Sequence, residues 1–324
     1  MISTSPLRYP GGKTRFIYII SDVLELLTPR PTVFVEPFCG GAGISLALLE
    51  NDLVPRIALN DLDELVASFW QVVFGKGQAT TADFEWLLAT VEHATISLDE
   101  WKRQKALRPA TLREAAWKCL FLNRTSFNGI LHKSGPIGGW KQENRTLDVR
   151  FNREKLLRRL GELRARRGQV DRVEQENWKA FCQRYAGRNN AFLYLDPPYY
   201  HRAEQLYGHL FSAAIHQQLR DYLTRKRTPW LLSYDDAPEV RQLYGNRAHI
   251  EARVVDQTYS AHPMGGASFV GRELLFSNRA FPAAAPDGQQ HVGVSIVGVM
   301  DTVQAAVAGP VRTRIVRPEL ITCQ

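Results

Sequence analysis

The stretch T-V-F-V-E-P-F-C-G-G-A-G-I-S-L-A-L-L-E, residues 32–50, decides the fold of this chain. Its first part, residues 32–38, is apolar and β-branched, which is typical of a buried strand. A glycine turn follows, and residues 44–50 then favour a helix. This strand, turn and helix predict an α/β fold built on a sheet.

Further apolar runs extend this unit into a mostly parallel sheet that is interrupted once. Two prolines end one of the strands abruptly, because proline cannot donate to a strand ladder. We expect strands at residues 56–59, 191–195 and 230–234, a helix from the cap Ser212 to about Arg225, and a hairpin of residues 252–255 and 272–277 at the sheet edge.

The interruption lies between residues 62 and 172, where the pattern becomes helical and basic. Residues 100–172 alone contain 19 Lys and Arg against 7 Asp and Glu. Four tryptophans in this segment lie on apolar faces and are expected in the core: Trp70, Trp86, Trp101 and Trp117. We expect residues 1–64 and 173–282 to form one domain, residues 65–172 an inserted one, and residues 283–324, which have no clear period, a loosely ordered tail.

Composition limits the class of protein. Of 324 residues, 44% are hydrophobic and 23% charged, as in ordinary folded, soluble proteins. No apolar run could span a bilayer and residues 1–13 lack a secretory signal, so the cytoplasm is the expected location and no membrane is expected as a partner. The cysteines, at positions 39, 119, 182 and 323, have no metal-ligand spacing, and we predict neither a zinc site nor a disulfide. The net charge of +8 favours an anionic partner.

The glycine turn, Cys39 to Gly43, and the carboxylate of Asp61 at the end of the next strand have nucleotide-binding geometry. Glycines let a ligand approach the backbone, and a carboxylate there can accept hydrogen bonds from both ribose hydroxyls. Leu46 stands where a dinucleotide fingerprint needs glycine, so NAD fits poorly. A tight turn followed by a solvated Asp remains the plainer alternative.

Asp196-Pro197-Pro198-Tyr199 is the sharpest signal, because it follows an apolar strand where α/β sheets bind their ligands. The Asp196 carboxylate and the Pro197 carbonyl are two fixed acceptors, and the Tyr199 ring is a flat face beside them. These groups suit a planar heterocycle with an exocyclic amine. The alternative is a proline turn that merely ends a strand.

These motifs, in this order, resemble the N6-adenine-specific DNA methyltransferases of the DNA adenine methylase type, which use S-adenosylmethionine. The resemblance covers roughly residues 5 to 280 and predicts a Rossmann-like methyltransferase sheet with helices on both faces. It is carried by L-R-Y-P-G-G-K at residues 7–13, E-P-F-C-G at 36–40, N-D-L-D at 60–63, D-P-P-Y at 196–199, and E-L-L at 273–275 with Asn278. Three positions depart from the usual pattern: Tyr9 for Trp, Ala42 for the second Gly, and Asp63 for Asn.

By this resemblance, Asp196, Pro197 and Tyr199 are catalytic, and Tyr9, Lys13, Phe38, Gly40, Asp61 and Asp196 bind the methyl donor. Lys13 would neutralise the donor's carboxylate, Tyr9 would line its pocket and Asp61 would bind its ribose. No metal is expected.

The same resemblance places DNA recognition in the basic insertion, so the expected partner is double-stranded DNA. N-R-T-S-F-N-G at residues 123–129 is similar to the family stretch that leads into a loop at the DNA, here residues 132–140. The implied DNA-binding residues are Arg124, Phe127, Asn128 and Lys133. The basic run at residues 153–172 has leucines at helical spacing and is expected to be an amphipathic helix, with phosphate contacts as a second interpretation.

The sequence therefore predicts methyl transfer from S-adenosylmethionine to the N6 amine of an adenine flipped out of duplex DNA, by an enzyme that is monomeric in solution. Three alternatives stay open: a cytosine-N4 methyltransferase, a catalytically silent DNA-binding protein on the same scaffold and, least favoured, a nicotinamide oxidoreductase.

Overall fold

The computed structural model describes residues 5–8, 13–143, 145–200, 211–245, 247–259, 269–282, 290–291 and 294–299. Within these ranges the strands form one sheet in the order β3-β2-β1-β4-β5-β7-β6-β9-β8. The strands are β1 Val33–Glu36, β2 Arg56–Asn60, β3 Val170–Glu174, β4 Ala191–Leu195, β5 Trp230–Asp235, β6 Glu251–Tyr259, β7 Phe269–Ser277, β8 Gln290–His291 and β9 Val294–Val299. The fold is α/β, as expected.

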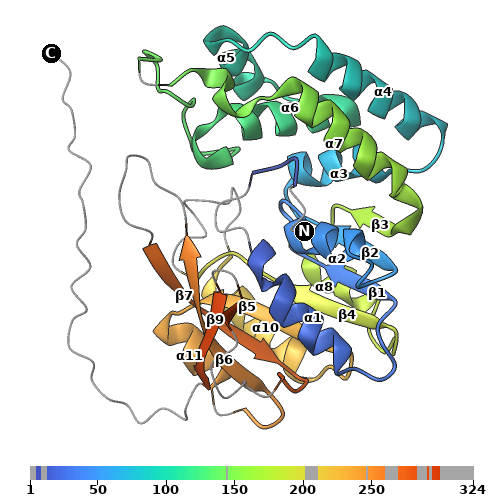
Figure 1. The fold of residues 1–324 in the computed structure, drawn as a ribbon, viewed down its shortest axis with the longest axis vertical. Helices are drawn as coiled ribbons and strands as arrows, with labels where there is room; N and C mark the ends of the chain where they lie inside the picture. The colour runs from blue at the N-terminus through green and yellow to red at the C-terminus, as the bar shows by residue number, and fades with distance from the viewer. Residues whose placement is uncertain are drawn as a thin grey trace, which may run out of the picture.

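Helices flank this sheet and form a separate layer beyond one of its ends (Figure 1). They are α1 Ile17–Glu25, α2 Gly43–Glu50, α3 Glu64–Phe74, α4 Gln78–Glu92, α5 Leu98–Ala106, α6 Leu112–Thr125, α7 Arg153–Ala165, α8 Trp178–Gln183, α10 Ala213–Thr224 and α11 Pro238–Tyr244. Short 3-10 helices occur at η1 Thr14–Phe16, η2 Phe127–Gly129, η3 Leu147–Arg150 and η4 Arg167–Gln169. Within the described ranges, every helix is too short or too polar to cross a lipid bilayer.

Strands β3, β2, β1, β4 and β5 are parallel, whereas β7, β6, β9 and β8 continue the sheet in antiparallel pairs. The chain order reverses between β1 and β4, which lie side by side. In open α/β sheets, ligands bind outside the carboxyl ends of the strands at such a reversal. The topology therefore points to the ends of β1 and β4 as the place for a site.

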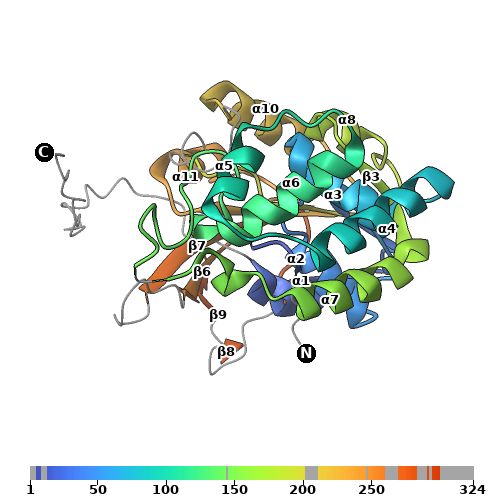
Figure 2. The same cartoon turned by 90° about the horizontal axis from the view of Figure 1, so that it is seen from above.

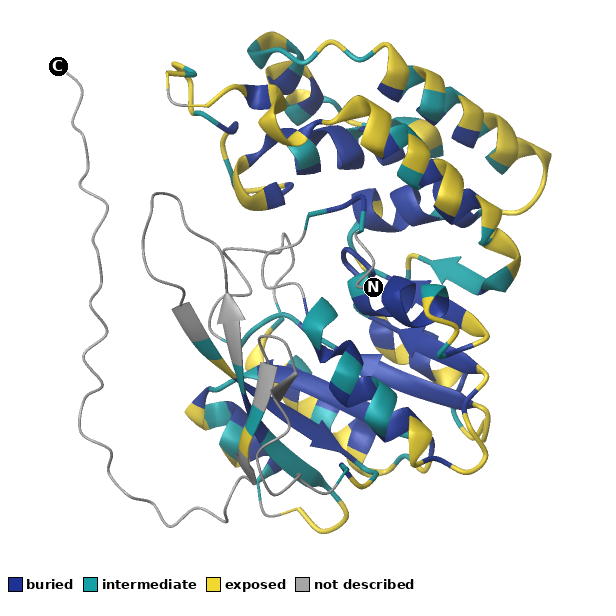
Figure 3. Ribbon diagram, viewed as in Figure 1, coloured by how far each residue is buried: buried dark blue, intermediate teal, exposed yellow. Residues whose placement is uncertain are grey.

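Side chains that alternate along each strand build two cores, one on each face of the sheet. Phe34 packs with α1 and α2 in one core, whereas Val33 and Val35 pack with α8, α10 and α11 in the other. The first core continues without a break into the helical layer through Phe84, Trp101 and Leu160, and the outer faces of that layer are exposed (Figure 3). Helices therefore cover both faces, as predicted (Figure 2).

The helical layer comprises α4 to α7 and packs on α3, which agrees with the expected helical insertion. The expected boundary at residue 172 is too late, because Val170–Glu174 forms the edge strand β3. Its sequence, V-D-R-V-E, mixes charged and apolar residues and has one buried position. An edge strand of this kind gives only a weak hydrophobic signal.

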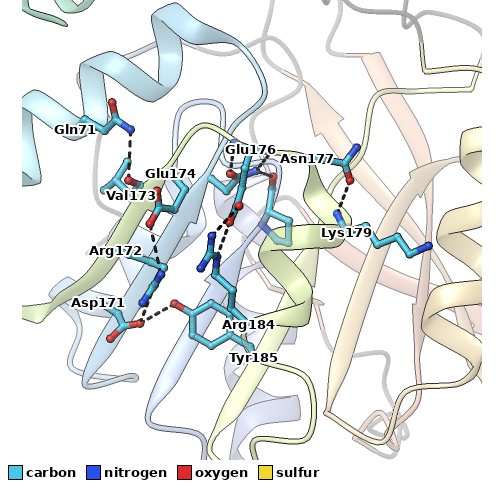
Figure 4. Close-up of polar contacts among 12 residues, drawn as sticks. Gln71, Asp171, Arg172, Val173, Glu174, Glu176, Asn177, Lys179, Arg184 and Tyr185 are labelled. Atoms are coloured by element: carbon cyan, nitrogen blue, oxygen red, sulfur yellow. Dashed lines mark hydrogen bonds and ion pairs between the residues drawn. The ribbon is translucent and has the colours of Figure 1, made fainter.

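Polar contacts attach β3 and the segment after it to the rest of the sheet (Figure 4). The Tyr185 hydroxyl donates to Asp171 Oδ2 at 2.6 Å, and Arg184 forms two hydrogen bonds with the Glu176 carboxylate at 2.7 and 2.9 Å. Two side chains that directly follow α8 therefore hold β3 and the turn after it.

Two expectations about the C-terminal part are wrong. The hairpin of β6 and β7 exists, but β6 also pairs with β9, so the hairpin does not lie at the sheet edge. Residues 290–291 and 294–299, which lie inside the expected loose tail, form β8 and β9. The run V-S-I-V-G-V of β9 alternates poorly, and its strand pairing depends on a partner about 40 residues earlier in the chain, which local periodicity does not reveal.

Ser212 is the N-cap residue of α10, as expected, but its side chain accepts no capping hydrogen bond. The tryptophan interpretation holds: Trp70, Trp101 and Trp117 are buried, and Trp86 packs against the same core. Cys39, Cys119 and Cys182 are buried free thiols, and Cys323 lies outside the described residues.

Candidate active site

Acidic side chains follow four neighbouring parallel strands at the point where each strand ends. Glu36 ends β1, Asp61 follows β2, Asp196 follows β4, and Asp235 ends β5. Because the carboxyl ends of parallel strands meet at one edge of a sheet, these carboxylates share one edge, at the chain reversal. This edge is the candidate active site.

The glycine turn crosses the end of β1. Gly40 and Ala42 both have positive φ, 44° and 49°. Left-handed backbone favours glycine, which explains why a glycine is usual where Ala42 stands. The Gly40 carbonyl accepts a hydrogen bond from Trp70 Nε1 at 2.8 Å, so a core tryptophan of α3 holds the turn.

Asp61 is tied to this turn. Its Oδ2 accepts from the Gly40 amide at 2.8 Å and its Oδ1 accepts from the Asp63 amide at 3.0 Å. Burial, followed by the nearby charge of Asp63, raises the pKa of Asp61 to about 7. The structure thus joins the glycine turn and the acidic residue that the sequence paired as a nucleotide site.

Asn60, directly before Asp61, is fully buried and connects three loops. Its amide nitrogen donates to the carbonyls of Pro37 at 2.9 Å and Glu176 at 3.0 Å, and its side-chain oxygen accepts from the Glu176 amide at 3.0 Å. These bonds hold the loops after β1 and β3 against the end of β2. Sequence reasoning named this residue only as part of a motif.

Glu36 was not predicted as a site residue, although it belongs to the glycine motif. Its side chain is buried and accepts a hydrogen bond from Ser45 Oγ of α2 at 2.5 Å. Burial, followed in smaller measure by repulsion from Asp196 and Asp61, raises the pKa of Glu36 to about 8. Because β1 lies between β2 and β4, the three carboxyl groups share one edge of the sheet.

Asp196 follows β4, and its Oδ1 accepts from Ser233 Oγ of β5 at 2.7 Å. Among the described residues, its other oxygen accepts no hydrogen bond. Burial raises the pKa of Asp196 to about 6. The positive charge of Lys13 lowers this pKa by less than burial raises it, and the negative charge of Glu273 raises it further. Pro197 is buried beside it. One carboxylate oxygen is thus fixed and the other remains available as an acceptor.

Tyr199 belongs to a polar network that connects the segment before the first helix with β7. Lys13 Nζ donates to the Tyr199 hydroxyl at 3.0 Å and lies 4.9 Å from the ring centroid. The hydroxyl donates to Glu273 Oε1 at 3.2 Å, and Lys13 forms an ion pair with Glu273. The Lys13 and Glu273 side chains are each 3% exposed. Lys13 therefore lies at the D-P-P-Y motif and forms its ion pair with Glu273 of β7. Its predicted role at a donor carboxylate stays a prediction.

Phe38 is half-buried among aromatic rings. Its centroid lies 6.4 Å from that of Trp178 and 5.8 Å from that of Phe211 in an edge contact. Tyr9, the other aromatic residue expected at the donor site, lies outside the described residues.

The predicted DNA-binding residues cluster at the end of α6 and in the loop beyond it. Phe127 is 52% exposed, Asn128 and Lys133 are exposed, and Arg124 is half-buried. Trp140, at the end of the loop, is also exposed and contacts Trp101 edge to face. No contact within the described part of the chain joins these residues to Asp196.

One contact does connect this loop with the acidic edge. His132 Nε2 lies 2.5 Å from Asp63 Oδ2, while Asp63 Oδ1 accepts from the Leu65 amide and caps α3. Although burial acts to raise it, the hydrogen bond and charge of His132 lower the pKa of Asp63. Asp63, which stands where the resemblance expects Asn, thus contacts the loop through His132.

The edge suits a cationic ligand. Glu36 is buried, Asp61 and Asp196 are half-buried, and loss of solvation raises the pKa of all three carboxyl groups. A positive charge on a bound ligand would favour their ionised forms. In the described ranges, no group of His, Cys, Asp and Glu side chains is arranged to hold a metal ion.

Comparison with known proteins gives three findings. The family model for D12 class N6 adenine-specific DNA methyltransferases matches residues 9–259. The Type II methyltransferase M.MjaIII of Methanocaldococcus jannaschii is 24% identical over 212 residues, which are 60% of this chain and 68% of that protein. Among solved structures, the rRNA methyltransferase aviRa of Streptomyces viridochromogenes aligns over 85% of this chain and 88% of that chain, with a TM-score of 0.34 and 14% identity, too low a likeness for any argument to rest on it.

Proposed function

This chain belongs to the D12 class N6 adenine-specific DNA methyltransferase family, and we propose that it methylates the N6 amine of an adenine flipped out of duplex DNA, with S-adenosylmethionine as donor. The observation that carries this proposal is the Asp196 carboxylate, held by Ser233 through one oxygen and followed by Pro197 and Tyr199 at the carboxyl end of β4.

The donor site that we propose lies between the ends of β1 and β2. Asp61 accepts from the ribose hydroxyls, Gly40 lets the donor approach the backbone, and Phe38 contributes to an aromatic wall. The carboxylates of the edge stabilise the donor's positive charge, and Lys13 stays near its carboxylate. S-adenosylmethionine, when bound, supplies an electrophilic methyl group.

The target amine has a delocalised lone pair and is a poor nucleophile. In the proposed mechanism, the free Asp196 oxygen and the Pro197 carbonyl accept hydrogen bonds from the amine and aim its lone pair at the donor. With a pKa of about 6, Asp196 is mostly ionised at neutral pH and can accept. Positioning of this kind needs no metal ion.

An adenine within a duplex cannot reach this edge, so the base must be flipped out, at a cost of roughly a few kcal/mol. Tyr199 stabilises the flipped base by stacking, and its hydroxyl bonds to Lys13 and Glu273 fix the ring. Residues of the helical layer, Arg124, Phe127, Asn128 and Lys133, bind the DNA. We accordingly propose the helical layer as a DNA-recognition domain on the catalytic sheet, in a cytoplasmic enzyme that acts as a monomer.

Single-molecule sequencing of DNA from cells that express the protein tests the base and reports its sequence context. We expect N6-methyladenine within one short sequence. N4-methylcytosine alone would favour the cytosine enzyme, and unmodified DNA that the purified protein still binds would favour the silent scaffold.

Substitutions at the tetrapeptide then test the mechanism on a duplex with 2-aminopurine at the target base. Asp196→Ala should keep the fluorescence rise that reports flipping and lose turnover. Tyr199→Ala should reduce the rise, because stacking is worth roughly 1–3 kcal/mol per base. Tyr199→Phe is the matched control, since it keeps the ring and should keep the rise. Normal turnover by Asp196→Ala would show that the tetrapeptide only ends a strand.

A further inference from the structure

Three arginines converge at the end of α6 without a carboxylate partner. Arg124 lies in the last turn of α6, Arg150 ends η3, and Arg8 precedes the first helix. Arg124 Nη1 donates to the Arg150 carbonyl at 3.4 Å. Within the described residues, none of the three forms an ion pair.

The position of Arg8 is fixed by the neighbouring motif. Asn123 accepts from the Arg8 amide at 2.6 Å and donates to the Arg8 carbonyl at 2.7 Å. Gly129 has a φ of 75°, and a Cβ built on it would lie only 2.5 Å from the Arg8 carbonyl oxygen. The first and last positions of the N-R-T-S-F-N-G motif therefore hold Arg8 beside Arg124.

Two nitrogens of this cluster, Arg8 Nη1 and Arg124 Nε, are buried and have no hydrogen-bond acceptor. Burial, and then repulsion from Arg8 and Arg150, lowers the pKa of Arg124 to about 10. Burial and Arg150 also lower the pKa of Arg8. Buried donors without acceptors and adjacent like charges both destabilise a protein, so the arrangement calls for a ligand that supplies negative charge and acceptor oxygens.

We propose that Arg8, Arg124 and Arg150 bind one phosphodiester group of the DNA backbone, an inference that rests on the proposed DNA substrate. Guanidinium groups bind phosphate oxygens in pairs of hydrogen bonds. The cluster directly adjoins the exposed Phe127 and Asn128, so a strand that contacts these residues passes the arginines. It adds Arg8 and Arg150 to the surface that the sequence predicted.

The test measures duplex affinity by fluorescence anisotropy as a function of salt. Each phosphate contact contributes about 0.9 to the slope of log affinity against log salt. Arg150→Gln and Arg8→Gln should each bind more weakly at low salt and flatten the slope by up to about that amount. The control is Arg188→Gln, an exposed arginine just before β4, at the opposite end of that strand from Asp196, which should leave the slope unchanged.

Thermal melting separates a binding role from a structural one. Because neutralisation relieves repulsion, the two variants should melt at or above the wild-type temperature and should keep donor affinity. A slope that stays at the wild-type value in both variants overturns the proposal. If, in addition, inorganic phosphate raises the melting temperature of the wild type but not of Arg150→Gln, at equal ionic strength with chloride, the cluster binds free phosphate instead.

These outcomes are distinct from failure of the proposed activity. A flattened slope together with N4-methylcytosine in the product leaves the phosphate site intact and removes the adenine assignment. Adenine methylation with unchanged slopes supports the proposed activity and removes the phosphate site. A wild-type protein that binds no duplex removes both.

Discussion

At the ends of β1, β2 and β4, the residues Glu36, Asp61 and Asp196 have raised pKa values of about 8, 7 and 6, for which burial is the largest cause. A cationic ligand favours the ionised forms and lowers these pKa values when it binds, so protons are released. Affinity for S-adenosylmethionine should therefore rise with pH and level off only above about pH 8, the highest of the three pKa values.

Calorimetry in two buffers of different ionisation enthalpy measures both the affinity and the released protons. S-adenosylhomocysteine, which lacks the sulfonium charge, is the control and should show a smaller rise. A donor affinity that is constant or falls with pH would contradict the electrostatic account of the site.

Lys13 and Glu273 form an ion pair in which both side chains are almost fully buried. Removing one partner of such a pair leaves the other charge buried and uncompensated, which strongly destabilises the protein. Removing both charges destabilises it much less. Lys13→Met or Glu273→Gln alone should lower the free energy of unfolding by roughly 3 kcal/mol, and the double variant by less than the sum. Urea denaturation of the four proteins gives this cycle, and additive losses would mean that the two charges do not interact.

Lys13, Asp61, Asp196 and Tyr199 were predictable as candidate site residues, because each stands in a short recognisable segment; their roles stay predictions. The sequence places Glu273 only at the start of a strand, since one acidic residue in an apolar run does not reveal which side chains face it. Lys13 and Glu273 are 260 positions apart in the sequence, and the pairing of β7 with β5 brings Glu273 to the strand next to β4, which Asp196 follows.

At the scale of elements, α7 shows why a basic run need not be a DNA-binding surface. Leu156, Leu160 and Leu163 are buried, as their spacing predicted. The same helix also turns a charged residue inward, because Arg164 Nη1 donates to the carbonyls of Val72, Val73 and Gly75 at the end of α3. Hydrophobic periodicity predicts the leucine face but not an arginine that caps another helix.

Arg164→Gln should therefore destabilise the protein. The variant removes the charged donors from terminal carbonyls of α3 and should lower the free energy of unfolding by about 1.5–3 kcal/mol. Arg158→Gln on the same helix is the matched control, because Arg158 is largely exposed and pairs with Glu162 at 3.7 Å. Its change should stay within about 0.5 kcal/mol. Equal losses in both variants, by urea denaturation, would contradict the capping role.

The strands show the same limit. Apolar β1, β4 and β5 were located from sequence because buried strands have continuous hydrophobic runs. The polar edge strand β3 and the late strand β9 were missed, since their positions depend on pairing with β2 and β6. The sheet's parallel centre was therefore predictable, and its two margins were not.

At the scale of the whole molecule, the sheet and the helical layer share one continuous core, and the contact of His132 with Asp63 joins the loop of residues 132–140 to the acidic edge. Asp63 also donates its amide to Asp61, the proposed ribose ligand. A donor that binds Asp61 would therefore be connected to the loop through Asp63, which contacts both Asp61 and His132. By linkage, the loop's response to DNA must act back on donor binding to the same extent.

His132→Ala should uncouple the two ligands. In the wild type, S-adenosylhomocysteine should tighten duplex binding by a factor that corresponds to about 1–3 kcal/mol of coupling, and in the variant this factor should approach one. Anisotropy titrations with and without the donor analogue measure it. His132→Asn, which retains a side-chain donor for Asp63, should restore part of the coupling, whereas Lys133→Ala should weaken DNA binding without changing the factor. An unchanged factor in His132→Ala would mean that donor and DNA communicate through the shared core, because the His132–Asp63 contact would then carry none of the coupling.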